Sequence, residues 1–233
     1  MKHGKKYREV SALRDRATTY SVEEAVGLIK QMPKAQFDET VEVSARLGVN
    51  PRHADQMVRG TVVLPHGTGR TVRVLALVKG EHVEVAKEAG ADMIGADEYL
   101  EKIQGGWADT DVIITTPDMM KDVGRLGKIL GPRGLMPNPK SGTVTTDVGK
   151  AVREVKAGKV EYRVDKGSNI QVPVGKAAFD SDKLTENVRT LFRELIRVKP
   201  ATAKGKYLRS AFLSCSMGPS VRLEESDLTA LAR

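Results

Sequence analysis

The sequence predicts a mixed fold of two domains, an α+β two-layer domain built from both termini and an α/β domain inserted between them. In the outer thirds of the chain, apolar and polar residues alternate with the period of a strand that is covered on one face. In the middle third, nearly continuous apolar strands alternate with helices, as in a sheet covered on both faces. We therefore expect residues 1–67 and 159–233 to form one domain and residues 68–158 the other.

The charge distribution points to the same division. The 233 residues include 38 Lys and Arg and 30 Asp and Glu, a net charge of +8. Residues 1–67 carry 11 basic and 8 acidic residues, residues 68–158 carry 13 of each, and residues 159–233 carry 14 and 9. The whole basic excess thus lies in the outer thirds, which predicts that the domain formed from both ends faces a polyanion such as nucleic acid.

Composition limits the other classes of protein. One cysteine, Cys215, excludes an internal disulfide and a cysteine-rich metal site, and is typical of a reducing cytoplasm. Aromatic residues make up only 4% of the chain, so base stacking cannot dominate a binding surface. The basic N-terminus lacks the apolar region of a signal peptide, and no apolar run approaches the ~20 residues of a membrane helix. We expect no membrane partner.

The first third combines a capped helix with alternating strands. Ser21 and Glu24 have the spacing of a capping box, and apolar residues follow at helical intervals until Pro33. The elements expected here are a partly ordered arm (1–20), a helix from 22 to Pro33, a strand within 37–50, a turn or short helix (50–56) and a strand (58–64).

The middle third predicts a three-layer, Rossmann-like α/β domain. Its expected strands are 72–78, 90–95 and 112–116, and its helices are 83–89, 97–103 capped by Asp97, and 147–156. Asp109 and Asp111 are expected to cap or turn the chain, and Trp107 to be a core or lid residue. Prolines and glycines forbid one continuous helix over 121–143 and predict a bent, partly apolar loop system.

The last third returns to alternating strands. The turn 166–169 is expected to join strands 159–165 and 170–174 in a hairpin. The remaining expected elements are an amphipathic helix (182–198), a basic loop (199–206), strands (207–214 and 220–223) joined by a turn, and a polar tail.

The run GRLGKILGPRGLMPNPKSGTV, residues 124–144, resembles the signature of the L-one family of large-subunit ribosomal proteins. The resemblance extends over nearly the whole chain. It implies binding to large-subunit ribosomal RNA at the mobile stalk beside the tRNA exit site, help in releasing deacylated exit-site tRNA, and repression of the protein's own operon messenger. It also implies a cytoplasmic protein bound to the large ribosomal subunit, monomeric when free, with no cofactor or metal and no enzymatic activity.

The resemblance implies an RNA-binding site in three segments, 37–42, 165–169 and 208–222. The matching positions are Phe37, Thr40, Glu42, Lys166, Ser168, Ser210, Ser214, Ser216, Met217 and Gly218. The chain departs from the family pattern at Ser216, where threonine is usual, and at Gln36, where lysine is common. These departures put in doubt one methyl contact and one phosphate contact.

Chemistry independent of the resemblance favours the same segments. Hydroxyls and bare backbone N–H groups reach phosphates and 2′-hydroxyls, and Gly218 lets a ribose approach the backbone. Met217 can cover a sugar or base, although a core methionine is the commoner reading. Glu42 could accept from a guanine edge or a 2′-hydroxyl, orient an arginine, or be an ordinary solvated strand residue. The turn at 216–219 could equally be a plain hairpin turn.

Two rival functions remain to be weighed. A nucleotide-dependent enzyme would need a phosphate loop, but Gly127-Lys128 is followed by Ile129 and not by a hydroxyl residue. The four histidines are scattered without ligand spacing, and the GxxG pairs at 124–127 and 131–134 are better explained as turns. A messenger regulator that never joins the ribosome is the second rival, and co-sedimentation with ribosomes would separate it. Auxiliary RNA contacts could come from Arg125, Lys128, Arg133 and Lys140.

Two glycine-containing crossings join the two predicted domains. They lie at 66–69, with Gly67 and Gly69, and at 157–159, with Gly158. Two such crossings side by side predict a hinge on which the domains open and close.

Overall fold

The structure is a computed structural model that describes residues 4–32 and 35–231. The predicted helix stop at Pro33 lies outside the described residues. By its backbone contacts the chain divides into two compact units, Met1–Gly69 with Val160–Arg233, and Arg70–Lys159. The prediction of a mixed α/β fold is confirmed, because helices alternate with several sheets, one of them parallel.

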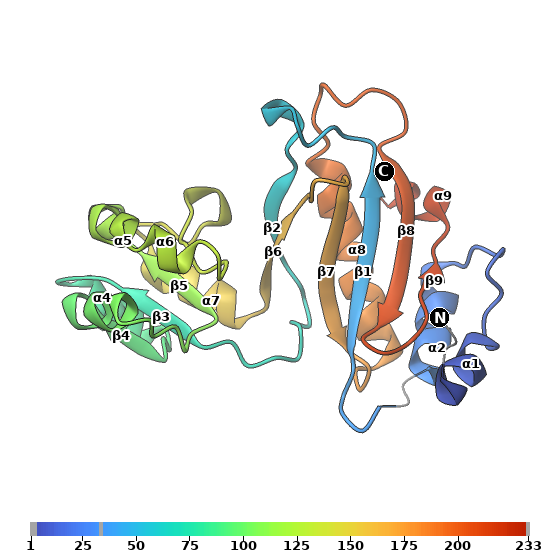
Figure 1. The fold of residues 1–233 in the computed structure, drawn as a ribbon, viewed down its shortest axis with the longest axis horizontal. Helices are drawn as coiled ribbons and strands as arrows, with labels where there is room; N and C mark the ends of the chain where they lie inside the picture. The colour runs from blue at the N-terminus through green and yellow to red at the C-terminus, as the bar shows by residue number, and fades with distance from the viewer. Residues whose placement is uncertain (1–3, 33–34, 232–233) are drawn as a thin grey trace. The chain divides into compact units, whose positions relative to one another are not determined.

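The first unit is organised around an antiparallel sheet with strand β1 at its centre (Figure 1). In the described part of the chain the strand order is β7-β1-β8-β9. The bounds are Thr40–Leu47 for β1, Asn169–Lys176 for β7, Leu208–Cys215 for β8 and Val221–Arg222 for β9. A strand from the first third of the sequence therefore lies between two strands from the last third, and both ends of the chain contribute to one sheet.

The alternation of β1 explains how this sheet is covered. Val41, Val43, Ala45 and Leu47 are buried, whereas the residues between them are exposed or half-buried. The buried face packs against helices α2 (Val22–Gln31) and α8 (Ser181–Arg197), which share one apolar core with the strands (Figure 1). The opposite face carries the polar residues of the alternating pattern.

The capping box predicted at the start of α2 is confirmed. The Ser21 hydroxyl accepts from the Glu24 N–H at 3.3 Å, and the Glu24 carboxylate accepts from the Ser21 N–H at 3.0 Å. Helix α8 follows Asp180 and buries one apolar stripe that includes Leu184, Leu191 and Leu195. The capping box and the helical spacing thus determined these helices locally.

Three predictions for the first unit are wrong. Strand β6 (Lys159–Arg163) pairs with β2 (Arg59–Val63) and not with β7, so 166–169 is no hairpin turn. Strand β7 pairs with β1 instead. The turn between β6 and β7 is held by Asp165, whose carboxylate accepts from the Gly167 and Asn169 N–H groups at 2.8 and 2.7 Å. The arm contains helix α1 (Lys5–Ser11), and the polar tail contains helix α9 (Glu225–Ala230), because Val10 and Leu228 are buried in the core.

The second unit has three layers around a parallel sheet of order β4-β3-β5 among its described strands. One face of the sheet packs on helices α3 and α7, and the other packs on α4, α5 and α6. The bounds are β3 Val74–Leu77, α3 His82–Glu88, β4 Met93–Gly95, α4 Asp97–Gln104, β5 Val112–Thr115, α5 Met120–Arg125, α6 Gly127–Leu130 and α7 Val148–Lys156. Both faces of β3 are buried, as its continuous apolar run predicts.

Sequence reasoning missed several details of this unit. The stretch 121–143 holds short helices as well as bends, with 3-10 turns at Pro117–Met119 before it and at Pro139–Ser141 within it. Asp97 does not cap α4 but pairs with Lys79 at 2.9 Å. Asp111 pairs with Arg70 at 2.6 Å, since the strand ends bring these charges together. In the first unit, by contrast, the turn or short helix predicted over 50–56 is confirmed as the 3-10 turn Ala54–Gln56. In the described part of the chain, no helix is long and apolar enough to cross a membrane.

Candidate nucleic-acid interface

The polar face of the antiparallel sheet brings together predicted site residues from both ends of the chain. In the register, Glu42 lies opposite Ser214 and Arg46 lies opposite Ser210. Directly opposed residues of antiparallel strands point to the same face, so these side chains share the face that α2 and α8 leave open. Hydroxyls, a carboxylate and a guanidinium are therefore displayed together on a rigid sheet.

Glu42 has no ion pair with any other described residue. The reading in which it orients an arginine is therefore not supported by a contact. Its side chain is exposed between Ser214 on β8 and Pro173 on β7. An exposed carboxylate in this place can accept hydrogen bonds from a base edge or a 2′-hydroxyl.

One end of this face is held by a clip between Ser216 and Thr40. The Ser216 hydroxyl accepts from the Thr40 N–H at 3.1 Å and lies 3.3 Å from the Thr40 carbonyl, and the Ser216 N–H donates to that carbonyl at 3.0 Å. Lys176 adds its ammonium group, which donates to the Thr40 hydroxyl at 3.0 Å. The clip fixes the start of β1 against the turn that follows β8.

Glu39 is part of the same end, and sequence reasoning missed it. Its side chain is only 1% exposed, and its two carboxylate oxygens accept from the Ala35 N–H at 3.1 Å and the Met217 N–H at 3.0 Å. A buried carboxylate is tolerated where backbone donors satisfy it. The only signal for it in the sequence is an acid beside the apolar face of a strand, which is too common to single it out.

Two large apolar side chains are exposed beside this carboxylate. Met217 is 66% exposed and Phe37 is 56% exposed. The reading of Met217 as a core residue is therefore wrong: its backbone N–H is bonded to Glu39, and its side chain is exposed. Gly218 follows, and a Cβ there would lie 3.4 Å from Cβ of Cys215. Exposed apolar groups beside hydroxyls suit contact with riboses and bases.

The other end of the face is formed by the turn at 165–169. Lys166 is exposed, and Ser168 adopts a left-handed φ of 67°. The Ser168 hydroxyl donates to the Val49 carbonyl at 2.9 Å, and its own carbonyl accepts from the Leu47 N–H at 2.8 Å. From Thr40 to Leu47 the strand spans about 23 Å, so the predicted residues form two groups at opposite ends of one strand.

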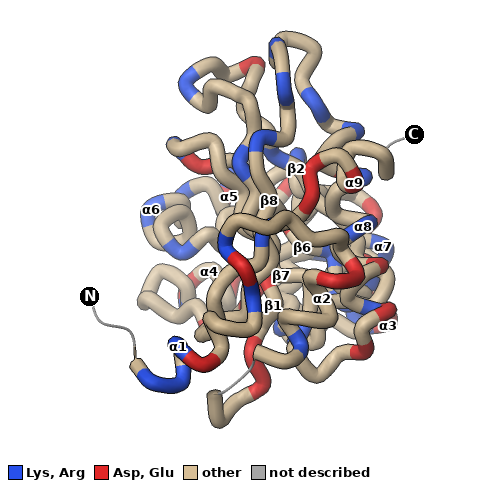
Figure 2. The backbone as a smooth tube through the Cα atoms, turned by 90° about the vertical axis from the view of Figure 1, so that its right-hand side faces the viewer, with Lys and Arg blue, Asp and Glu red and all other residues tan. Residues whose placement is uncertain are grey.

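Basic residues gather in the loops beyond the Leu47 end of this sheet, as Figure 2 shows. These residues are Arg52, Lys166, Lys199, Lys204 and Lys206, and Arg209 follows at the start of β8. The first unit carries 24 Lys and Arg against 17 Asp and Glu, and the second carries 14 against 13. The attraction for a polyanion therefore comes almost entirely from the unit that holds the hydroxyl face.

The four auxiliary cations belong to the second unit and not to the unit that holds this face. Arg125, Lys128, Arg133 and Lys140 are all exposed, and Arg125 lies 3.7 Å from Asp122. Lys140 lies within the 3-10 turn Pro139–Ser141, and its N–H donates to the side-chain oxygen of Asn138 at 2.8 Å. Their side chains are available for contact with an anion, and Asp122 partly neutralises one of them.

The hinge glycines adopt backbone angles that favour glycine. Their φ values are 63° at Gly67, 71° at Gly69 and 103° at Gly158. The Gly67 carbonyl accepts from the side-chain amide of Asn187 at 3.0 Å, and a Cβ on Gly69 would lie 2.8 Å from the Phe179 ring. The first crossing is thus packed onto the first unit as far as Gly69.

Among the described residues, no group of three or more His, Cys, Asp or Glu side chains could hold a metal ion. Cys215 is buried at the end of β8, where its thiol donates to the Ile29 carbonyl at 3.6 Å. Burial raises the pKa of this thiol to about 12, so the sulfur is protonated at neutral pH. It is a structural group and not a nucleophile.

Comparison with known protein families adds one finding to this geometry. A family model described as "Ribosomal protein L1p/L10e family" matches residues 28–219, more than half of the chain. The chain belongs to the ribosomal protein L1p/L10e family. Members of this family are structural proteins that bind ribosomal RNA and are not enzymes.

The part matched to the ribosomal protein L1p/L10e family contains the polar sheet face. It runs from α2 through Gly218, and so includes both the Thr40 end and the Ser168 end of the face. Helix α1 and the final elements β9 and α9 lie outside it. The chain is therefore a ribosomal protein that binds ribosomal RNA and is associated with the large ribosomal subunit.

Proposed function

We propose that this protein binds the mobile stalk of large-subunit ribosomal RNA through the polar face of its antiparallel sheet. It assists release of deacylated tRNA from the exit site, and it represses translation of its own operon messenger by binding a similar RNA fold. In this proposal the free protein is monomeric, and it acts while bound to the ribosome in the cytoplasm.

The observation that carries the proposal is the meeting of both ends of the chain around β1. This arrangement lines up Thr40, Ser214 and Ser216 with exposed Met217 and Phe37 on one basic unit. Hydroxyls and exposed main chain read sugars and phosphates by shape, and the surrounding cations contribute a term that depends on salt.

Each group of residues has its own role in this proposal. Ser210, Ser214, Ser216 and Thr40 bind sugar hydroxyls and phosphates, Gly218 admits a ribose, and Phe37 and Met217 pack on sugar or base. Glu42 accepts from a guanine edge or a 2′-hydroxyl, and Lys166 with Ser168 holds the strand at the other end. Arg125, Lys128, Arg133 and Lys140 provide auxiliary contacts to RNA.

A titration tests this site. The stalk RNA and a scrambled duplex of equal length are titrated at two salt concentrations with wild-type protein and with Ser216→Val/Met217→Ala. We expect the double variant to lose at least tenfold in affinity for the stalk RNA, about 1.4 kcal/mol, and to bind the duplex unchanged. Ser216→Thr, which keeps the hydroxyl, is the matched control. Equal wild-type affinity for both RNAs would contradict readout of a specific shape.

Repression of the messenger requires a separate measurement. We expect a reporter that carries the start of the protein's own messenger to be repressed by wild-type protein and released by Ser216→Val/Met217→Ala, since one face would bind both RNAs. Co-sedimentation of the protein with large subunits separates this proposal from a regulator that never joins the ribosome.

A further inference from the structure

A hollow lies beside Lys166. It is at the Leu47 end of the sheet, where basic loops gather (Figure 2). Its volume is about 760 Å³. The loop that follows β1 contributes Pro51, Arg52 and Met57, and the end of β6 with the turn after it contributes Arg163, Val164 and Lys166. All of these residues belong to the first unit, so the hollow does not depend on the second.

The two walls of this hollow are joined by hydrogen bonds. The Val164 N–H donates to the Val58 carbonyl at 2.9 Å, and the Ser168 hydroxyl donates to the Val49 carbonyl at 2.9 Å. Within the second wall, Asp165 holds the turn by accepting from backbone N–H groups. The hollow is therefore formed before a ligand binds, which lowers the ordering cost of binding.

The charge at the rim favours an anion. Arg52, Arg163 and Lys166 are exposed, and no ion pair joins them to another described residue. Nearby Arg59, by contrast, is neutralised by Glu161 at 2.6 Å. Asp165 is the acid among the described lining residues, and its oxygens are turned toward the backbone of its own turn. The rim thus carries three cations that have no ion pair with another described residue, and one carboxylate whose oxygens already accept hydrogen bonds from the backbone.

The floor of the hollow favours more than a bare anion. Met57 is 38% exposed and Pro51 is half-buried, and both line the hollow. Sites for small ligands have volumes of roughly 300–1,000 Å³, so this hollow holds a ligand larger than phosphate. A ligand with an anionic group and a flat apolar part matches both the rim and the floor, and a nucleotide has both.

We propose that this hollow binds one unstacked nucleotide of the bound RNA. Its base packs on Met57 and Pro51, and its phosphate is held by Arg52 and Arg163, whose guanidinium groups also stack on bases. This inference rests on the proposed RNA-binding function and extends it. Lys166 belongs both to the hollow and to the predicted face, so one RNA strand can pass from the sheet into the hollow.

Two methionine methyl groups provide separate reporters for the test. In protein labelled with carbon-13 at the methionine methyls, Met217 reports binding at the sheet face and Met57 reports the hollow. Each signal is assigned by a Met→Leu variant. On titration with the stalk RNA we expect both signals to shift.

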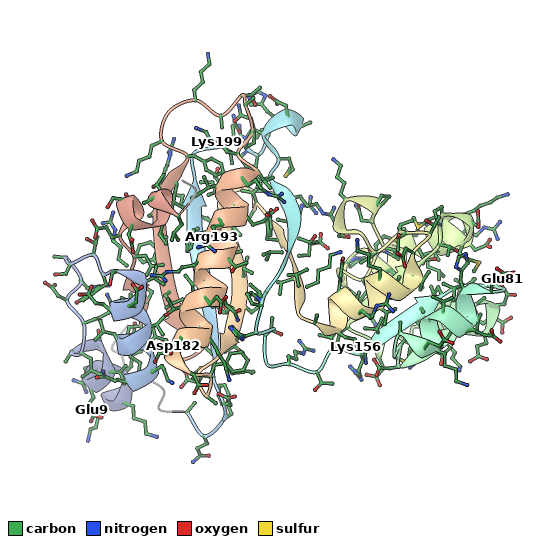
Figure 3. All side chains as sticks on the ribbon, turned by 180° about the vertical axis from the view of Figure 1, so that it is seen from behind. Glu9, Glu81, Lys156, Asp182, Arg193 and Lys199 are labelled. Atoms are coloured by element: carbon green, nitrogen blue, oxygen red, sulfur yellow. The ribbon has the colours of Figure 1, made fainter. Side chains whose placement is uncertain are left out.

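Arg52→Gln/Arg163→Gln removes the rim charge while keeping side-chain length. We expect this variant to lose the Met57 shift and keep the Met217 shift. Its salt slope for RNA binding should fall by roughly 0.7 to 0.9, the value for one phosphate. The control is Arg193→Gln/Lys87→Gln, which removes the same charge from an exposed position on α8 (Figure 3) and one on α3. Its salt slope and both methyl shifts should match wild type.

The outcomes separate the two proposals. A Met217 shift with an unmoved Met57 signal overturns the nucleotide site and leaves the proposed function standing. If neither signal moves, the proposed function fails, and this inference fails with it. Titrations with AMP, UMP and inorganic phosphate test the source of the ligand. A Met57 shift with free nucleotide or phosphate but not with RNA overturns the RNA strand as occupant, whereas a shift with RNA supports it.

Discussion

At the scale of single residues, the buried carboxylate of Glu39 connects two distant parts of the sequence. It accepts one hydrogen bond from Ala35 and one from Met217, which is 178 positions away in the chain. Both bonds are charge-assisted and shielded from water, so each is stronger than a surface bond. Glu39 thereby orients the turn on which the Met217 side chain is exposed.

Replacing this carboxylate tests the role. Glu39→Gln keeps the shape of the side chain, but its amide nitrogen cannot accept a hydrogen bond, so one backbone N–H loses its partner. We expect a loss of about 1–3 kcal/mol in the free energy of unfolding, measured with denaturant, together with weaker binding of stalk RNA. Glu88→Gln, at an exposed position of α3, is the control. Equal midpoints for the two variants would show that the buried bonds contribute nothing.

Cys215 gives a second prediction at this scale. Burial raises the pKa of its thiol from 9.0 to about 12. We expect iodoacetamide to label the native protein far more slowly at pH near 8 than it labels the unfolded chain, since the thiolate is the reactive form. Rapid labelling of native protein would refute this burial.

The sign of the linked effect on stability follows from the raised pKa. In the folded state the thiol keeps its proton at a pH where an unfolded thiol ionises. The stability that the buried, protonated thiol contributes is therefore fully present below the unfolded pKa of about 9. This stability is lost as pH rises toward the folded pKa of about 12.

At the scale of elements, α8 both covers the sheet and holds the start of the crossing between the units. Asn187 is fully buried on this helix. Its amide nitrogen donates to the carbonyls of Gly67 at 3.0 Å and Val174 at 2.8 Å, and its amide oxygen accepts from the His66 N–H at 3.2 Å. One side chain thus satisfies three backbone groups from two other segments.

Asn187→Leu should be severely destabilising. It fills a similar volume but leaves three backbone groups without partners. We expect a loss on the order of 3 kcal/mol or more in the free energy of unfolding, measured by denaturant titration. Arg193→Leu, at an exposed site on the same helix, should change stability by less than about 0.5 kcal/mol. A similar small loss in both variants would mean that water replaces the amide bonds.

At the scale of the whole molecule, we propose that the two crossings form a hinge. The first crossing is anchored through Gly67 and Gly69 to α8 and to Phe179, so the proposed pivot lies beyond Gly69 on one chain segment and at Gly158 on the other. The cations on the second unit could then reach RNA or tRNA without any change in the sheet face.

Small-angle X-ray scattering tests the proposed hinge. We expect small-angle X-ray scattering to give a broader distribution of dimensions for the free protein than for its complex with stalk RNA, because bound RNA restricts the crossings. The control is Ser216→Val/Met217→Ala mixed with the same RNA, which should retain the broad distribution. One narrow distribution in both the free and the bound protein would remove the hinge.

Much of the fold and part of the site could be predicted from local patterns. Alternation over 40–47 identified the buried face of β1, and the apolar run over 74–77 identified a strand covered on both sides. The capping box located the start of α2. The motif at 124–144 indicated the family, and the match over 28–219 confirms it. The individual RNA-contact residues stay predictions.

The sequence by itself determined which face of each strand is apolar, where the main helices begin, and the family to which the chain belongs. These properties depend on residues that are close together in the sequence. Only the tertiary structure decided that β6 pairs with β2 and that the tail and the arm contain helices. Only the tertiary structure showed that Glu39 is a buried carboxylate bonded to Ala35 and Met217, and that a hollow lies beside Met57. Strand partners and burial depend on segments far apart in the chain, whose packing free energy no local pattern contains.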